Sequence, residues 1–136
     1  MDSLSWIEKD KYMKEIRDYL ITIARTGNIT ISYSKLVDQL DLNYDLRDPE
    51  DREYLVEDVG DVSVYEHGKG RPLLSALVIH KMSKNQGDSF YKVYGELHGI
   101  DWEVVKSNKK KYVKKEMEDC RTFWKDSENF RKFKND

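Results

Sequence analysis

The segment Glu66-His67-Gly68-Lys69-Gly70-Arg71 brings an acid, an imidazole and two cations together within six of the 136 residues. Its two glycines make the backbone flexible. A histidine beside a carboxylate can act as a general base, and an arginine can hold an anionic group. One hypothesis is therefore a hydrolase centred on Glu66, His67 and Arg71. In the structural alternative, His67 hydrogen-bonds the turn and Arg71 pairs with a nearby carboxylate.

Catalytic and metal-binding patterns are otherwise absent from the sequence. Gly68-Lys69-Gly70 lacks the Walker pattern of a phosphate loop, and no G-x-S-x-G, H-E-x-x-H or kinase signature occurs. His67, His80 and His98 are separated by 13 and 18 residues, and none forms a close pair with Cys120. Zinc sites usually contain at least one close ligand pair. We therefore expect no metal site and no cofactor, and we favour a binding module over an enzyme.

The second half of the chain contains a basic run. Its lysines are Lys106, Lys109, Lys110, Lys111, Lys114 and Lys115. Together with Arg71, this run carries enough positive charge to contact several phosphates of a nucleic acid. On a helix, the same lysines could instead pair with Glu116, Glu118 and Asp119 and form an ordinary solvated face. The sequence leaves both interpretations open.

The stretch 41–61 is acidic, with nine Asp or Glu residues against only Arg47 and Arg52. Negative charge there would repel phosphates, which counts against DNA binding by this part of the chain. It suggests instead a docking face for a basic protein partner, formed by Asp48, Glu50, Asp51 and Glu53. Mimicry of nucleic-acid charge, loose binding of a divalent metal and a plain acidic surface are the alternatives.

The two halves of the chain differ strongly in charge. Residues 1–68 carry 8 basic and 16 acidic side chains, while residues 69–136 carry 16 and 10. The halves thus have net charges of −8 and +6, although the whole chain is nearly neutral at −2. This division of charge favours a binding role over a catalytic one.

Apolar residues at helical spacing predict most of the elements that position these groups. The expected helices are 6–24, a short one capped by Ser32 or Ser34, one starting at Asp48-Pro49, one capped by Asp88 or Ser89, and a helical region from about 102 to 133. Two β-prone runs predict strands, Ile29–Ile31 and Leu73–Ile79. The second run is apolar on both faces, so we expect it to be a central strand.

This order of elements resembles a winged-helix arrangement over residues 12–98. Thr30, Tyr33 and Leu36 form a T-x-x-Y-x-x-L run, similar in kind to the T-Y-G-x-L/I/V-A segment of alkyltransferase-like DNA-repair domains. That resemblance implies a helix-turn-helix here. The family's reactive Cys lies in a Pro-Cys-His-Arg motif, whereas the strand after Pro72 has neither Cys nor His, so alkyl transfer is not implied. Residues 70–78 with Gly87, Phe90 and Tyr91 also resemble segments of uncharacterised bacterial proteins, which implies no function.

The sequence as a whole indicates one α+β domain spanning residues 1–136. We expect a winged-helix-like core with a small sheet (about 6–100) and a long C-terminal helical extension (about 101–133). Cys120 is the only cysteine, and neither a signal peptide nor an apolar run long enough to span a bilayer is present. We therefore expect a cytoplasmic protein without membrane association, and leave its oligomeric state open.

The functional expectation is a non-enzymatic binding or regulatory module that contacts nucleic acid through the C-terminal lysines. The alternative is a protein-interaction subunit or inhibitor that uses the acidic 41–61 face, and the hydrolase is the third hypothesis.

Overall fold

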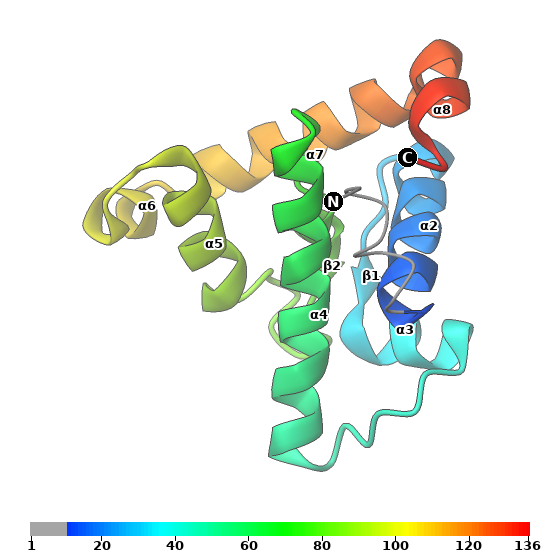
Figure 1. Ribbon diagram of the computed structural model, residues 1–136. Coiled ribbons are helices and arrows are strands. Elements are labelled where there is room, and N and C mark those ends of the chain that lie inside the picture. The colour runs from blue at the N-terminus through cyan, green and yellow to red at the C-terminus, as the bar shows by residue number, and fades with distance from the viewer. Residues whose placement is uncertain (1–10) are drawn as a thin grey trace.

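The computed structural model describes residues 11–136, and this part of the chain is predominantly helical (Figure 1). Its α-helices are α2 (Lys11–Thr26), α3 (Tyr33–Leu40), α4 (Pro49–Gly68), α5 (Asp88–His98), α6 (Trp102–Ser107), α7 (Lys109–Lys125) and α8 (Ser127–Phe133). A 3₁₀ helix, η1 (Leu74–Leu77), precedes the strand β2 (Val78–Ile79), which pairs in parallel with β1 (Ile31–Ser32). The expected winged-helix-like α+β core is therefore wrong.

The error lies mainly in the apolar run Leu73–Ile79, which was expected to be a central strand. Only its last two residues pair with another strand, and the preceding four form η1. A longer strand would need partners for its backbone groups, since unpaired N–H and C=O groups are costly in a core. β1 offers only two residues, so the run coils into a 3₁₀ helix, surrounded by α2, α4 and α7.

Side chains from three other segments complete the hydrogen bonding of this buried run. Glu116 Oε2 accepts from the N–H of Leu73 at 2.8 Å, and Cys120 Sγ donates to the carbonyl of Leu73 at 3.3 Å. The N–H of Ser75 donates to Ser63 Oγ at 2.9 Å, and Gln86 Nε2 donates to the carbonyl of Ala76 at 2.9 Å. α4, α7 and the loop before α5 are thereby fixed around η1.

Two of the predicted helix starts are confirmed. Ser32 caps α3 by accepting a hydrogen bond from the N–H of Lys35, and Asp48 caps α4 by accepting one from the N–H of Glu50. Proline at the first position of α4 needs no backbone donor there. Residues 6–10 of the first predicted helix lie outside the described residues.

The predicted cap of α5 is wrong. Neither Asp88 nor Ser89 caps the helix, because Gly87 occupies the cap position with a φ of 81°. A Cβ atom on Gly87 would lie 2.4 Å from Nε2 of the exposed His80 side chain, which would have to move. The positive φ, which residues with a side chain rarely adopt, explains the glycine.

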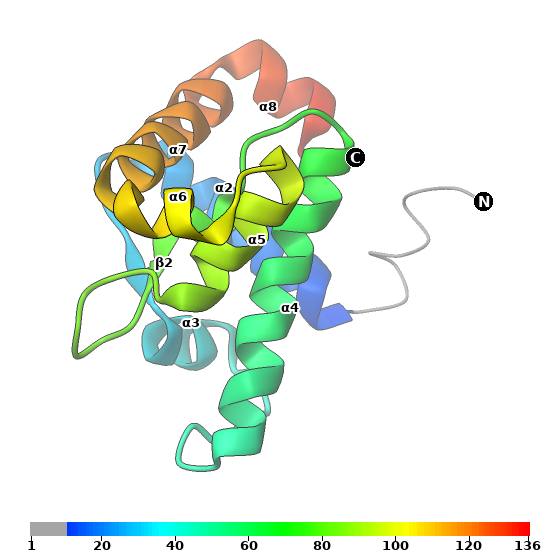
Figure 2. The same cartoon turned by 90° about the vertical axis from the view of Figure 1, so that its left-hand side faces the viewer.

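α4 runs through the middle of the fold (Figures 1 and 2). α2 and α3 lie on one side of it, α5 and α6 on the other, and α7 passes across one end. α7 belongs to the core, because Trp124 packs with the cluster around α2 and Val113 with the cluster around α5. The helical character predicted for the last third is confirmed by α6, α7 and α8. Among residues 11–136, no helix is both long enough and apolar enough to cross a membrane.

Candidate functional site

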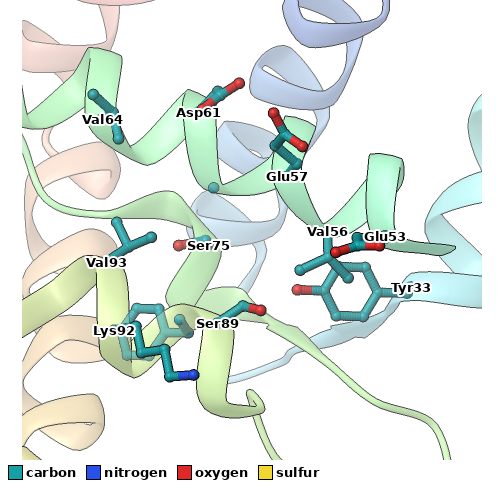
Figure 3. A pocket seen from close by; sticks show the side chains of 12 residues that line it. Tyr33, Glu53, Val56, Glu57, Asp61, Val64, Ser75, Ser89, Lys92 and Val93 are labelled. Carbon is teal, nitrogen blue, oxygen red and sulfur yellow. The ribbon is translucent and has the colours of Figure 1, made fainter. Parts of the chain in front are cut away.

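A groove of about 300 Å³ lies between α4 and α5, and we call it the α4/α5 groove (Figure 3). α4 supplies one wall, α5 the other, and Tyr33 at the start of α3 lies at one end. The groove combines an apolar floor with a few polar groups, which is the usual composition of a binding site.

One edge of the α4/α5 groove is a row of carboxylates. Glu53, Glu57 and Asp61 are spaced four residues apart on α4, which places them on one face of the helix. Glu53 and Glu57 form no ion pair with any residue in the described part of the chain. The row gives this edge a negative potential. Lys92 on α5 is the only cation that lines the groove within the described residues.

The floor of the α4/α5 groove is apolar. Val56 and Val64 line it from α4, and Phe90 and Val93 line it from α5. Val64 is 46% exposed, which is high for a valine and marks a place where a ligand could cover apolar surface. Gly60 contributes depth, because a Cβ atom there would lie 3.9 Å from Val93 Cγ2, within ordinary contact distance.

Three residues that line the groove carry hydroxyl groups, namely Tyr33, Ser75 and Ser89. Burial raises the pKa of Tyr33 to about 12, so its hydroxyl stays protonated near neutral pH and can donate a hydrogen bond. Ser75 Oγ is already bonded to Ser63 Oγ at 2.6 Å inside the core. The residues of the groove suit the binding of a cationic ligand that also has an apolar part.

The four acidic residues predicted to bind a partner do not lie together in the groove. Asp48 caps α4, and Asp51 Oδ2 accepts a hydrogen bond from the N–H of Asp45 at 2.8 Å. Glu50 lies in the same first turn, so only Glu53 lines the α4/α5 groove. Glu57 and Asp61, which were not among the predicted partner-binding residues, form one row with Glu53. Their spacing of four on an expected helix was the signal that could have shown it.

Within the cluster proposed for a hydrolase, the structure pairs Glu66 with Arg71 and not with His67. Glu66 Oε2 accepts hydrogen bonds from Arg71 Nη2 at 2.6 Å and from Arg71 Nε at 3.1 Å, and both side chains are buried. This ion pair is the structural role suggested for Arg71 as the alternative to catalysis, namely pairing with a nearby carboxylate. His67 and Arg71 line one groove, and the ring centroid of His67 lies 5.2 Å from the ring centroid of His98. The Glu66 carboxylate therefore binds arginine and does not orient a histidine as a general base.

A second, more open groove of about 570 Å³ runs past His67, His98, Glu116 and Asp119. Burial raises the pKa of Glu116, although the hydrogen bond from the N–H of Leu73 opposes this effect. Through this hydrogen bond, the Glu116 side chain fixes the start of the η1 segment. In residues 11–136, no group of three or more His, Cys, Asp or Glu side chains is arranged to hold a metal ion.

The predicted nucleic-acid-binding lysines fall into two groups. Lys106, Lys109 and Lys115 pair with Glu103 at 3.3 Å, Asp88 at 2.9 Å and Asp119 at 2.9 Å, respectively. The other three, Lys110, Lys111 and Lys114, are exposed and form no ion pair with a described residue.

Arg71 was predicted to contact nucleic acid with these lysines. It is only 5% exposed, and its guanidinium is bonded to Glu66 and to Asp136. The structure therefore does not bring Arg71 together with the exposed lysines.

No protein-family model, curated protein or solved structure matches this chain.

Proposed function

We propose that this protein is a non-enzymatic binding module that holds a basic, partly apolar segment of a partner protein in the α4/α5 groove. The observation that carries the proposal is the row of carboxylates formed by Glu53, Glu57 and Asp61 beside an apolar floor. Cations of the partner lie against the row, and its apolar side chains cover Val64 and Val93.

The two parts of the groove contribute differently to binding. Removal of apolar surface from water supplies most of the affinity, at about 25 cal/mol per Å². Carboxylates at an exposed edge add less energy, but they attract basic partners and reject acidic ones. The groove thus favours partners that carry both features.

The spacing of the carboxylates suits a helical or extended basic segment. Residues four apart on a helix are separated by about 6 Å along its axis, from a rise of 1.5 Å per residue. Arginines or lysines four apart on a partner helix have the same spacing. The volume of about 300 Å³ accommodates a few side chains of such a segment rather than a whole helix.

Binding of a fluorescent helical peptide, with arginines on one face and leucines on the adjacent face, tests this proposal. Fluorescence anisotropy measures its affinity for the protein at low salt. We expect the E53Q/E57Q double variant to bind about tenfold more weakly, because it removes two rim ion pairs. A second variant, Gly60→Leu, fills the groove and should also weaken binding.

The matched control is the D38N/E96Q double variant. It removes the same charge from two exposed acids outside the groove, and neither side chain forms an ion pair with a described residue. Its affinity should equal that of the unmodified protein. Equal weakening by both double variants, or full affinity of Gly60→Leu, would contradict binding in the groove.

A further inference from the structure

A stripe of basic side chains runs along the outer face of α7. We call it the α7 basic stripe, and its members are Lys110, Lys111, Lys114, Arg121 and Lys125. The spacings Lys110–Lys114, Lys114–Arg121 and Arg121–Lys125 are four, seven and four residues, which keeps these side chains on one helical face. The opposite face of α7 is buried through Val113, Glu116, Cys120 and Trp124. The stripe therefore faces solvent.

The positive charge of the α7 basic stripe is largely uncompensated. Its four lysines are exposed, and none forms an ion pair with a residue in the described part of the chain. Arg121 is held in place, because its Nη2 donates to the carbonyl of Ile29 at 3.0 Å. Glu118 is the one acid on this face. Lysines elsewhere on the same segment differ, since Lys109 and Lys115 are both neutralised by acids.

A shallow groove of about 380 Å³ follows the stripe where α7 passes Asn28. Lys114, Arg121 and Lys125 line it together with Thr122. Lysine and arginine can neutralise phosphates, and a threonine hydroxyl can donate to a phosphate oxygen. The cations that line this groove all belong to the α7 basic stripe, so the groove makes part of the stripe concave.

The aromatic side chains of α7 decide between possible anionic partners. Tyr112 stacks on Tyr94, Phe123 packs against Trp124 and Phe133, and these rings on α7 are half-buried or buried and are not members of the basic stripe. Proteins that bind single strands stack bases on accessible aromatic rings. Helices that bind membranes insert exposed apolar side chains. The α7 basic stripe offers neither, so it matches the phosphate backbone of a duplex.

We propose that the α7 basic stripe binds the backbone of double-stranded nucleic acid without reading its sequence. The acidic first turns of α4 lie at the opposite end of the molecule from α7 (Figures 1 and 2), so they do not oppose the approach of a duplex. No ion pair among the described residues joins the 41–61 stretch to α7. This surface shares no residue with the α4/α5 groove, so binding of a duplex by the stripe does not depend on binding of a peptide in the groove.

The experiment measures the affinity of a fluorescent DNA duplex by anisotropy over a series of salt concentrations. Each phosphate contact contributes about −0.9 to the slope of log Kobs against log salt concentration. We expect the K110Q/K114Q/K125Q triple variant to weaken binding and to make the slope shallower by about 2.7, since it removes three contacts. Glutamine has nearly the helix propensity of lysine, so α7 stays folded.

The control variant, K35Q/K81Q/K84Q, removes the same charge from exposed lysines outside the stripe, on α3 and in the loop before α5. It should retain the slope of the unmodified protein. Equal losses in the two triple variants would overturn the proposal, as would a salt-independent affinity. Tighter binding to single-stranded DNA of the same length, or to vesicles of anionic lipid, would also overturn it.

Discussion

Arg17 on α2 donates a hydrogen bond through Nε to Glu66 Oε2 on α4, at 3.2 Å. The two residues are 49 positions apart, and both are almost inaccessible to solvent. The same carboxylate oxygen also accepts from Arg71, while Arg17 donates to the carbonyls of Phe133 and Lys134 at 2.9 Å each. Glu66 thus links α2, the run leading into η1 and, through Arg17, the end of α8.

Replacement of Glu66 by glutamine should lower the free energy of unfolding by about 3 kcal/mol, because it leaves the buried Arg17 without a carboxylate partner among the described residues and leaves Arg71 with Asp136 alone. Urea denaturation followed by tryptophan fluorescence measures the change. The control is Glu128→Gln, which breaks the exposed pair with Arg131 and should cost less than about 0.5 kcal/mol. Similar stabilities for these two variants would show that the buried pair contributes little.

The substitution of glycine by alanine should have opposite effects on α4 and α5. At Gly60 a Cβ atom makes only an ordinary contact, at 3.9 Å from Val93 Cγ2. Gly60→Ala should therefore raise the free energy of unfolding by about 0.5–1 kcal/mol through helix propensity. At Gly95 a Cβ atom would lie 2.9 Å from the carbonyl oxygen of Ile100 and 3.1 Å from Val105 Cγ2.

Gly95→Ala should lower the free energy of unfolding by about 1 kcal/mol, since overpacking outweighs the propensity gain. Thermal unfolding of the two variants, measured side by side, makes each the control for the other. A rise in melting temperature for Gly95→Ala would mean that the α5–α6 turn relaxes more freely than its geometry indicates.

Glu116 should make the stability of the protein fall as the pH rises. Burial raises the pKa of its carboxyl in the folded state, so the folded protein binds more protons than the unfolded chain between the two pKa values. The stabilisation by the neutral acid is complete below the unfolded pKa of about 4.3 and is lost as the pH rises through the folded pKa. Glu116→Gln stays neutral and keeps an oxygen that can accept from the N–H of Leu73.

The measurement is the free energy of unfolding near pH 4.5 and near pH 7 for both proteins. The loss of stability over this interval should be smaller in Glu116→Gln than in the unmodified protein. An identical pH dependence would show that the Glu116 carboxyl does not change its proton affinity on folding.

Local signals in the sequence predict the helices well, because each signal acts within one turn. Ser32 and Asp48 form side-chain caps that depend only on the next three residues. Val113, Cys120 and Trp124 follow helical spacing and are buried. These elements need no knowledge of distant parts of the chain.

The prediction of a strand over Leu73–Ile79 is wrong because it depends on distant parts of the chain. An apolar run shows that the segment is buried, but it does not show whether backbone partners exist on either side. Here the partners are the side chains of Ser63, Gln86, Glu116 and Cys120, which come from other elements. The α4/α5 groove could not be predicted from the sequence for the same reason. Val93 and Lys92 lie beside the acidic row only because α5 packs on α4.

Cys120 should be protected from thiol reagents in the folded protein. Its Sγ is fully buried and donates to the carbonyl of Leu73, and burial raises the pKa of the thiol. The thiolate, which is the reactive form, is therefore both scarce and inaccessible. Because Cys120 is the only cysteine in the chain, labelling reports on one site alone.

When the chain recloses faster than the reagent reacts, the labelling rate follows the free energy of opening. Glu66→Gln should then react about 100-fold faster than the unmodified protein, as a loss of about 3 kcal/mol requires. Glu128→Gln should react at nearly the original rate. Fast labelling of the unmodified protein in the absence of denaturant would instead show that α7 separates from η1 without global unfolding, and that Cys120 does not hold this part of the core closed.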